Sequence, residues 1–298
     1  MNERKNIHQP VLLQEVIEYL DLKPGYCFID ATLDGGGHTR AVLERYPDAK
    51  ILGIEIDAAE VASLVENYPD IKERITIVNN SYTHLQDIVQ QHNIRPDGIL
   101  FDLGLSSWHF EASGRGFSFQ KDELLDMRFD PGGSNSTAAE ILNQSPEQEL
   151  IKILEEYGEE QFAHEIASAI IQVRQEKPIT TTTELVHLIK RAVPAWYTHR
   201  KIHAATKTFQ ALRVAVNQEL ENIRQGIAAA LEVLPPKGRL LVISFQGSED
   251  KIVREFFKQK AKEGIIQWVT RKTIRPTWDE MKDNPRARSA KMKIIEKL

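Results

Sequence analysis

Four short apolar runs divide the first third of this 298-residue chain. They are residues 27–31 (CFIDA), 51–56 (ILGIEI), 75–78 (ITIV) and 98–102 (GILFD). Each run has the length of a strand and ends in polar or glycine-rich residues, and amphipathic stretches separate the runs. This alternation is typical of strand–helix–strand units whose strands lie parallel in one sheet. The amino-terminal part is therefore predicted to have an α/β fold.

The second part of the chain changes character before strand signals return. Residues 108–213 read as loops and helices, with helices expected at 147–157, 161–175, 183–192 and 206–230. Strand signals resume at 239–245, 265–270 and 291–296, which brings the expected sheet to seven strands. We therefore predict a seven-stranded, mostly parallel sheet domain formed by residues 1–107 and 214–298. A helical insertion domain on the substrate side is predicted at 108–213, and the helix at 206–230 would return the chain to the sheet.

Composition excludes several classes of protein. No apolar run approaches the roughly 18 residues of a membrane span, and the first residues lack the apolar core of a secretory signal, so a cytoplasmic location is expected. Cys27 is the only cysteine, which rules out an internal disulfide or a thiolate metal cluster. The net charge of −5 disfavours a general nucleic-acid binder. Two local basic stretches, 190–213 and 271–293, are read either as solvated helix faces or as phosphate-binding surfaces.

A glycine-rich turn follows the first predicted strand. Residues 34–38 (DGGGH) place three glycines between that strand and a helix expected to begin near Thr39, so a ligand can approach the backbone closely. Glu55 ends the next strand, 20 residues after Gly35, where a carboxylate can accept hydrogen bonds from both hydroxyls of a ribose. This combination predicts a nucleoside pocket. The alternative is a tight turn and a strand cap without a ligand.

The cofactor could be S-adenosylmethionine or a dinucleotide, because both classes of fold use a strand, a turn and a distant acid. The three adjacent glycines differ from the G-x-G-x-x-G pattern of dinucleotide-binding proteins. Asp30 at the strand end suits an ammonium and a sulfonium better than a pyrophosphate. We therefore predict S-adenosylmethionine and keep a nicotinamide-dependent oxidoreductase as the alternative.

Asp102 ends the fourth predicted strand, at the edge where open α/β sheets bind ligands. The lone pair of a cytosine amine is delocalised into the ring, so an enzyme must accept hydrogen bonds from the amine and align its nitrogen with the methyl group. Asp102 is the candidate for this catalytic role. It could instead bind the cofactor or cap the following helix.

Several longer blocks resemble one family, the bacterial 16S rRNA cytosine N4-methyltransferases known as RsmH or MraW. The blocks are residues 34–38 (DGGGH), 97–107 (DGILFDLGLSS), 115–119 (RGFSF), 125–128 (LDMR), 157–160 (YGEE), 208–213 (TFQALR) and 284–289 (NPRARS). The likeness extends over almost the whole chain. It implies a class I Rossmann-like methyltransferase fold with an inserted helical domain. It also implies methyl transfer from S-adenosylmethionine to N4 of a cytidine in 16S rRNA, with the small ribosomal subunit as partner.

The resemblance implies a set of cofactor contacts, which are Gly36, Gly37, His38, Glu55, Tyr82, Asp102 and His109. The family more often shows Asp and Phe where this chain has Glu55 and Tyr82, which preserves the carboxylate and the ring. It usually has Pro-Gln where this chain has Trp108-His109. Gln246 replaces a family histidine and cannot titrate, so it is given no catalytic role. Ala204 replaces a proline, which alters backbone stiffness only.

On the substrate side, cations and aromatic rings suit a displaced base and its phosphates. The residues expected to contact RNA are Arg115, Phe117, Phe119, Arg128, Lys207, Arg213, Arg286 and Arg288. Phe117 and Phe119 could also be core residues, and the spacing of Phe209 to Leu212 favours the core for Phe209. His199 and His203 have the spacing of a helical metal pair, but no third ligand follows, so no metal is predicted.

Two other kinds of protein remain as alternatives to an RNA methyltransferase that extrudes its target base. One is the oxidoreductase described above. The other is a ribosome-assembly factor that has kept the cofactor pocket without the chemistry, which the changes at residues 108, 109 and 246 suggest.

Overall fold

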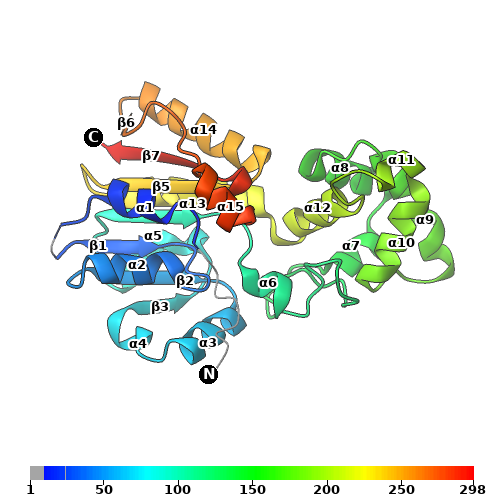
Figure 1. Cartoon of the computed structure of the whole chain (residues 1–298), viewed down its shortest axis with the longest axis horizontal. Helices are drawn as coiled ribbons and strands as arrows, with labels where there is room; N and C mark the ends of the chain where they lie inside the picture. The colour runs from blue at the N-terminus through cyan, green and yellow to red at the C-terminus, as the bar shows by residue number, and fades with distance from the viewer. Residues whose placement is uncertain (1–9, 24) are drawn as a thin grey trace. The chain divides into compact units, whose positions relative to one another are not determined.

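The computed structural model describes residues 10–23 and 25–298 and divides the chain into two compact units (Figure 1). The sheet unit comprises the chain up to Ser106 together with Leu220–Leu298, and the helical unit is Ser107–Glu219. For comparison, the predicted insertion was 108–213. No helix within the described residues is long and apolar enough to cross a membrane.

The sheet unit contains seven strands in the order β3-β2-β1-β4-β5-β7-β6. They are β1 (Cys27–Asp30), β2 (Lys50–Glu55), β3 (Thr76–Asn79), β4 (Gly98–Asp102), β5 (Arg239–Ser244), β6 (Ile266–Trp268) and β7 (Lys291–Lys297). The first five pair in parallel, whereas β7 lies antiparallel between β5 and β6. This is the class I methyltransferase sheet, and it confirms the predicted fold class. The antiparallel β7 also separates it from the 3-2-1-4-5-6 parallel order of dinucleotide-binding domains.

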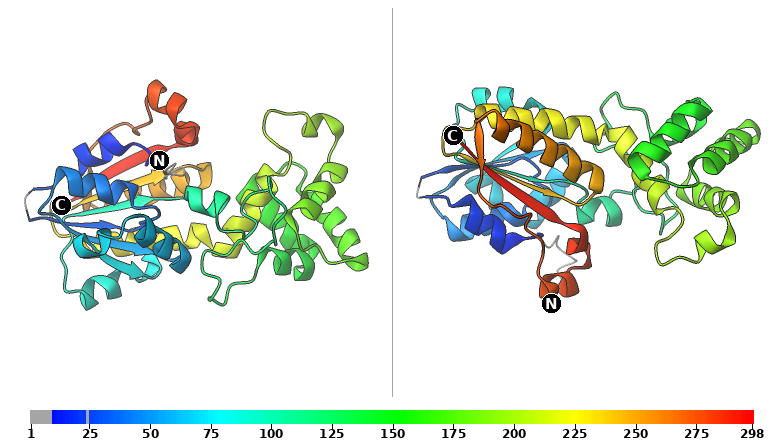
Figure 2. Two further views of the ribbon diagram at one scale, coloured as in Figure 1. Left: turned by 60° about the horizontal axis from the view of Figure 1, so that its bottom comes forward. Right: turned by 90° about the horizontal axis from the view of Figure 1, so that it is seen from above.

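Helices cover both faces of this sheet, as both views in Figure 2 show. One face carries α1 (Leu13–Leu20), α2 (Gly37–Arg45), α3 (Ala58–Asn67) and the single turn α4 (Ile71–Arg74). The other face carries α5 (Leu85–Gln91), α13 (Glu219–Val233) and α14 (Gly247–Lys262). The short elements η1 (Tyr82–His84), α15 (Trp278–Asp283) and η2 (Pro285–Ser289) complete the unit.

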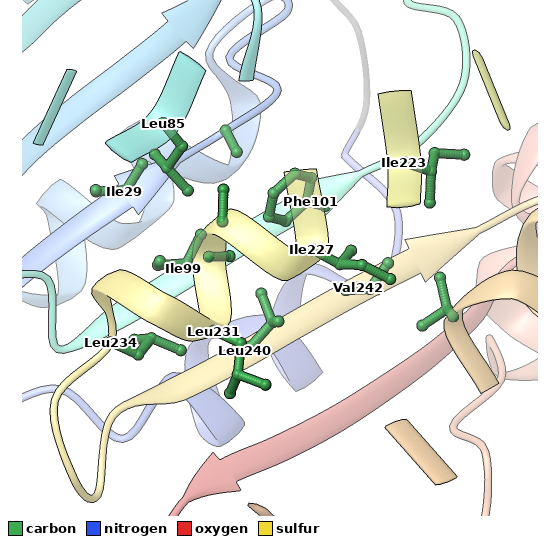
Figure 3. Close-up of a cluster of buried hydrophobic side chains, with 14 of the residues drawn as sticks. Ile29, Leu85, Ile99, Phe101, Ile223, Ile227, Leu231, Leu234, Leu240 and Val242 are labelled. Carbon is green, nitrogen blue, oxygen red and sulfur yellow. The ribbon is translucent and has the colours of Figure 1, made fainter. Parts of the chain in front are cut away.

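Two hydrophobic cores lie on opposite faces because successive side chains of a strand point to opposite sides. In β4, Ile99 and Phe101 enter the core under α5, α13 and α14, and Leu100 enters the core under α1, α2 and α3. Figure 3 shows the first core, where Ile227 and Leu231 of α13 lie over Ile99 and its neighbours. Both sheet faces are therefore buried, as expected for strands that read as continuous apolar runs.

The helical unit is formed by α6 (Ser107–Glu111), α7 (Ala138–Gln144), α8 (Glu147–Gly158), α9 (Ala163–Glu176), α10 (Thr182–Ala192), α11 (Ala195–Thr198) and α12 (Thr206–Asn217). Thr137 and Thr181 begin α7 and α10 with capping boxes, as their sequences allow. Helix α8 packs directly on α12. A Cβ at Gly158 would lie 2.6 Å from the Lys207 carbonyl oxygen, so only glycine permits this approach.

The predicted single helix 206–230 is wrong in one respect, because it is two helices. Gln218 adopts a left-handed conformation with φ of 50° and separates α12 from α13. The side chain of Asn217 fixes the break, since its amide donates to the Met127 carbonyl at 2.8 Å and its oxygen accepts from the Phe129 N–H at 2.8 Å. Neither partner is close in sequence, so local pattern gives no sign of the break.

Candidate cofactor site in the sheet unit

Three carboxylates lie at the carboxyl ends of neighbouring parallel strands. Asp30 ends β1, Glu55 ends β2 and Asp102 ends β4, and all three are at most 6% exposed. The strand order places β1 between β2 and β4, so these ends share one edge of the sheet. The three acids that the sequence places at strand ends therefore lie along the same edge of the sheet.

The glycine turn connects β1 to α2 and is fixed by the strand-end acid. The Asp30 carboxylate accepts a hydrogen bond from the Thr39 hydroxyl at 2.7 Å, and Thr39 lies in the first turn of α2. Gly36 has φ of 70°, and a Cβ there would lie 2.9 Å from a methyl group of Leu64. Glycine is thus required at this position by both conformation and space. The predicted helix start near Thr39 is two residues late, since α2 begins at Gly37.

Glu55 is held by backbone donors on both sides. One carboxylate oxygen accepts the Asp57 N–H at 2.9 Å and the other accepts the Asp34 N–H at 2.9 Å. An ionised carboxylate has about four acceptor positions, so about two remain for a ligand. The side chain is therefore fixed in place and retains the capacity that two ribose hydroxyls need.

Burial makes this group of acids unfavourable as anions. Burial raises the pKa of Asp30 to about 7, although the hydrogen bond from Thr39 acts to lower it. Burial also raises the pKa of Glu55 to about 7, although the hydrogen bonds from Asp57 and Asp34 act to lower it. Burial raises the pKa of Asp102 well above its usual range, with Asp30 and Glu249 adding to it. Among the described residues no Lys or Arg forms an ion pair with Asp30, Glu55 or Asp102. The site therefore favours a ligand that carries positive charge.

Asp102 faces His38 across the site. The His38 Nε2 lies 2.9 Å from the Val11 carbonyl oxygen, to which it can only donate, so Nδ1 is directed at the Asp102 Oδ2 at 3.7 Å. The other oxygen, Oδ1, is buried and has no hydrogen-bond partner among the described residues. A buried acceptor without a donor is costly, and a ligand with an N–H group would satisfy it.

Tyr82 lies in η1, directly after β3, and packs edge-on against Phe101 at 5.3 Å between ring centroids. Gly226 of α13 makes this position possible, because a Cβ there would lie 2.6 Å from the Tyr82 ring. The sequence prediction included Tyr82 but missed Gly226. A helical glycine opposite an aromatic ring carries no local signal of its own.

Asp34 and Glu60 were also missed as parts of the site. Their carboxylate oxygens and one of Glu55 all lie within 4.8 Å of one another, a spacing that could hold a cation. Burial raises the pKa of Asp34 well above its usual range, with Glu60 and Glu55 adding to it. Glu60 is in the first turn of α3, where an acidic residue is ordinary. The sequence therefore did not indicate that Glu60 lies near the site.

The remaining predicted cofactor residue, His109, belongs to the helical unit. It lies in α6, is 3% exposed, and its ring contacts Phe117 and Phe129, each at 5.1 Å. Phe117 is itself buried at 5% exposure and stacks on Phe129. Both residues thus belong to an aromatic cluster within the helical unit.

Most of the cations predicted to contact RNA have protein partners. Arg128 forms a two-point ion pair with Asp126, at 2.7 and 2.9 Å, and Arg213 forms one with Glu219 at the same two distances. Arg115 donates to the carbonyl oxygens of Arg128 and Phe129. The Lys207 ammonium donates to the Glu159 carbonyl oxygen at 2.5 Å.

Other predicted residues divide between surface and core. Arg286 and Arg288 are exposed in η2 of the sheet unit. Phe119 is half-buried and stacks on His203 at 4.6 Å, while Phe209 is 4% exposed, as its spacing predicted. Gln246 precedes α14, where the Glu249 carboxylate accepts the backbone N–H groups of Phe245 and Gln246.

Comparison with known proteins agrees with this geometry. A family model described as the MraW methylase family matches residues 5–298. The chain is 40% identical to the ribosomal RNA small subunit methyltransferase H of Carboxydothermus hydrogenoformans, with 98% of each protein covered. It is 43% identical to the protein of that name from Sulfurihydrogenibium azorense, covering 98% of this chain and 99% of that one. The glycine turn, the acidic sheet edge and these matches over the full length establish that the chain belongs to the MraW methylase family.

Proposed function

We propose that this chain transfers a methyl group from S-adenosylmethionine to the exocyclic N4 of a cytidine in 16S rRNA of the small ribosomal subunit. The observation that carries the proposal is the buried acidic edge formed by Asp30, Glu55 and Asp102, which has no Lys or Arg ion pair among the described residues. S-adenosylmethionine has the matching charges, a sulfonium and an ammonium. The methyltransferase names of the relatives support the reaction class and the ribosomal substrate.

The cofactor fits the residues of the sheet unit group by group. The two ribose hydroxyls would donate to Glu55, whose acceptor positions are only partly used. The positive groups would lie near Asp30 and Asp102, where they would relieve the cost of burying anions. The amino end of α2, which begins at Gly37, presents the positive end of the helix dipole to a carboxylate. When bound, the cofactor supplies a methyl group already activated by its sulfonium.

Asp102 is the residue we assign to the target base. Its Oδ1 is buried without a partner and would accept a hydrogen bond from the cytosine amine, which directs the nitrogen lone pair toward the methyl group. As the new N–C bond forms and the methyl–sulfur bond breaks, the nitrogen would become cationic and would have to lose a proton. A carboxylate whose pKa is raised by burial accepts that proton more readily than an exposed one. Gln246 cannot do so.

The acidic trio of Asp34, Glu55 and Glu60 is assigned to the environment of the cofactor, because Glu55 belongs to both groups. A divalent ion held by the trio would compete with the ribose for the same carboxylate. Methyl transfer is therefore expected to be unaffected by a chelator, and added magnesium is expected not to improve cofactor affinity.

Three measurements test the proposal. Isothermal titration calorimetry should show binding of S-adenosylmethionine to the full chain and no comparable binding of a nicotinamide dinucleotide. Radiolabel from the methyl group should enter small subunits from cells that lack this protein, and mass spectrometry of digested rRNA should identify N4-methylcytidine. Cofactor binding without label transfer would support the assembly-factor alternative, and label on another atom would overturn the assignment to N4.

A further inference from the structure

Trp196 is a large apolar side chain of the helical unit that the site above does not use. It lies in α11 (labelled in Figure 1), and 59% of its surface is exposed. Ile202, six positions along, is 53% exposed. Tryptophan is enriched at binding surfaces, because its ring offers a large apolar area together with a polar N–H group.

The Trp196 ring is held in place by neighbours. It makes edge contacts with Phe162 at 5.8 Å and with Tyr197 at 5.7 Å. Tyr197 is 2% exposed, and its hydroxyl donates to both oxygens of the buried Glu160 carboxylate at 2.8 and 2.9 Å. A ring fixed on such a base loses little freedom when a ligand stacks on it, which favours binding.

The charges near Trp196 in the sequence indicate which kind of partner would bind there. The stretch 190–213 contains six Lys or Arg and no Asp or Glu. Within it, Arg200 and Lys201 are exposed, and the Arg200 guanidinium lies over the Tyr197 ring at 4.5 Å. A groove elsewhere in the same unit, of about 360 Å³, is lined instead by Glu140 and Glu149, which would repel phosphate.

We infer that the surface formed by Trp196, Arg200 and Lys201 binds an unpaired segment of RNA. A base would stack on the exposed indole, and the two cations would contact the phosphates on either side. Aromatic stacking beside cations is how proteins bind single-stranded RNA, whereas the bases of a duplex are stacked on one another and inaccessible. This inference deepens the proposed function, on which it rests for the nature of the substrate.

The test is fluorescence anisotropy of a labelled, unstructured RNA oligonucleotide with the full chain. Trp196→Ala should weaken binding about tenfold, because stacking is worth roughly 1–3 kcal/mol per base, and Trp196→Phe should recover part of the loss. Arg200→Ala and Lys201→Ala should each weaken binding and flatten its dependence on salt. Leu124→Ala removes an equally exposed apolar side chain of the same unit, and Lys152→Ala an exposed cation on an acidic helix, so both should bind as the wild type does.

Affinity of Trp196→Ala within about twofold of the wild type, in a variant with an unchanged melting temperature, would overturn the inference. So would loss of binding to small subunits with binding to the oligonucleotide intact, because that result would assign the surface to a protein. Methyl transfer by the wild type distinguishes the two proposals. If the wild type transfers no methyl group while Trp196→Ala still loses RNA binding, the proposed function fails and the RNA surface stands.

Discussion

The carboxylate of Glu55 contributes to the site through two acceptor positions that the backbone leaves open. Glu55→Ala removes a charged acceptor for two hydroxyls, which should cost about 1.5–3 kcal/mol, or more than tenfold in affinity for S-adenosylmethionine. Glu55→Gln keeps one acceptor oxygen, and its affinity for S-adenosylmethionine should lie between those of the wild type and Glu55→Ala. Titration calorimetry measures all three affinities, and equal values would show that Glu55 does not contact the ribose.

Asp102 is expected to affect turnover more than binding. Asp102→Ala should lower kcat by about 100-fold or more, the usual contribution of a positioned acid or base, and should change cofactor affinity far less. Because burial raises the pKa of Asp102, the wild-type rate should increase with pH as this carboxyl loses its proton. Single-turnover rates across pH test both points. Equal losses in rate and in cofactor affinity would leave Asp102 only a role in holding the cofactor.

Burial of Asp30 is expected to lower the stability of the protein when no cofactor is bound. Its folded pKa of about 7 lies above that of an unfolded aspartate, so the fold retains a proton that the unfolded chain releases. Stability should therefore fall as pH rises from about 4 to about 7 and then level off. Asp30→Asn removes this effect. When neither protein has cofactor bound, the variant should have a higher melting temperature than the wild type at about pH 8, and the difference in melting temperature should be smaller near pH 5.

A matched control for Asp30 is Asp48→Asn, since Asp48 is an exposed carboxylate. It should leave the melting curve unchanged at both pH values. When S-adenosylmethionine is added, the wild type should instead melt at a higher temperature than Asp30→Asn, because the cofactor stabilises only the protein that binds it well. A lower melting temperature for Asp30→Asn at high pH would show that the bond to Thr39 outweighs the cost of burial.

The individual residues of the site differed in how visible they were in sequence. Asp30, Glu55 and Asp102 could be predicted because each directly ends an apolar run, and parallel strands bring such ends to one edge. Asp34, Glu60 and Gly226 could not, since their places depend on how α3 and α13 pack. Sequence pattern records the spacing along an element but not the contacts between elements that are distant in the chain.

Among the elements, the break between α12 and α13 is the clearest case of long-range contacts overriding local preference. Gln218 is a good helix former in a left-handed conformation, which costs roughly 1–2 kcal/mol for a residue with a Cβ. Gln218→Gly should therefore stabilise the protein or leave its stability unchanged. Gln225→Gly places the same change at an exposed position inside α13 and should destabilise it by about 1 kcal/mol. Urea denaturation compares the two, and destabilisation of similar size at both positions would contradict this view of the break.

In the strands, unlike at the break between α12 and α13, the local sequence pattern agrees with the structure. Each predicted strand was found within a few residues. For the central strands β1, β2, β4 and β5 the reason is burial on both faces, which needs apolar side chains at nearly every position, whereas β3 and β6 are only partly buried. What the runs could not reveal was their order, in particular the antiparallel insertion of β7 between β5 and β6. Strand order depends on connections and on core packing, which leave no periodic trace in a single sequence.

At the scale of the whole molecule, charge is distributed in a way that opposes general RNA binding. The net charge is −5, and positive charge gathers at 190–213 and 271–293. Arg128 and Arg213 already have carboxylate partners. Fewer cations are thus free for phosphate than the sequence suggests, which implies a shaped surface with few contacts rather than strong non-specific attraction.

From this distribution we predict that methylation requires an assembled or partly assembled small subunit. Label incorporation should be higher into isolated subunits than into deproteinised 16S RNA, and lowest into single-stranded DNA, at matched salt. The slope of log affinity against log salt should correspond to only a few phosphates, at about 0.7 per contact for a single strand. Lys207→Ala should reduce subunit binding while sparing cofactor affinity, whereas Arg213→Ala should lower thermal stability, because it leaves the buried Glu219 without its partner. Activity on DNA equal to that on subunits would contradict the ribosomal assignment, since it would mean that the enzyme recognises an accessible cytosine and not the surface around it.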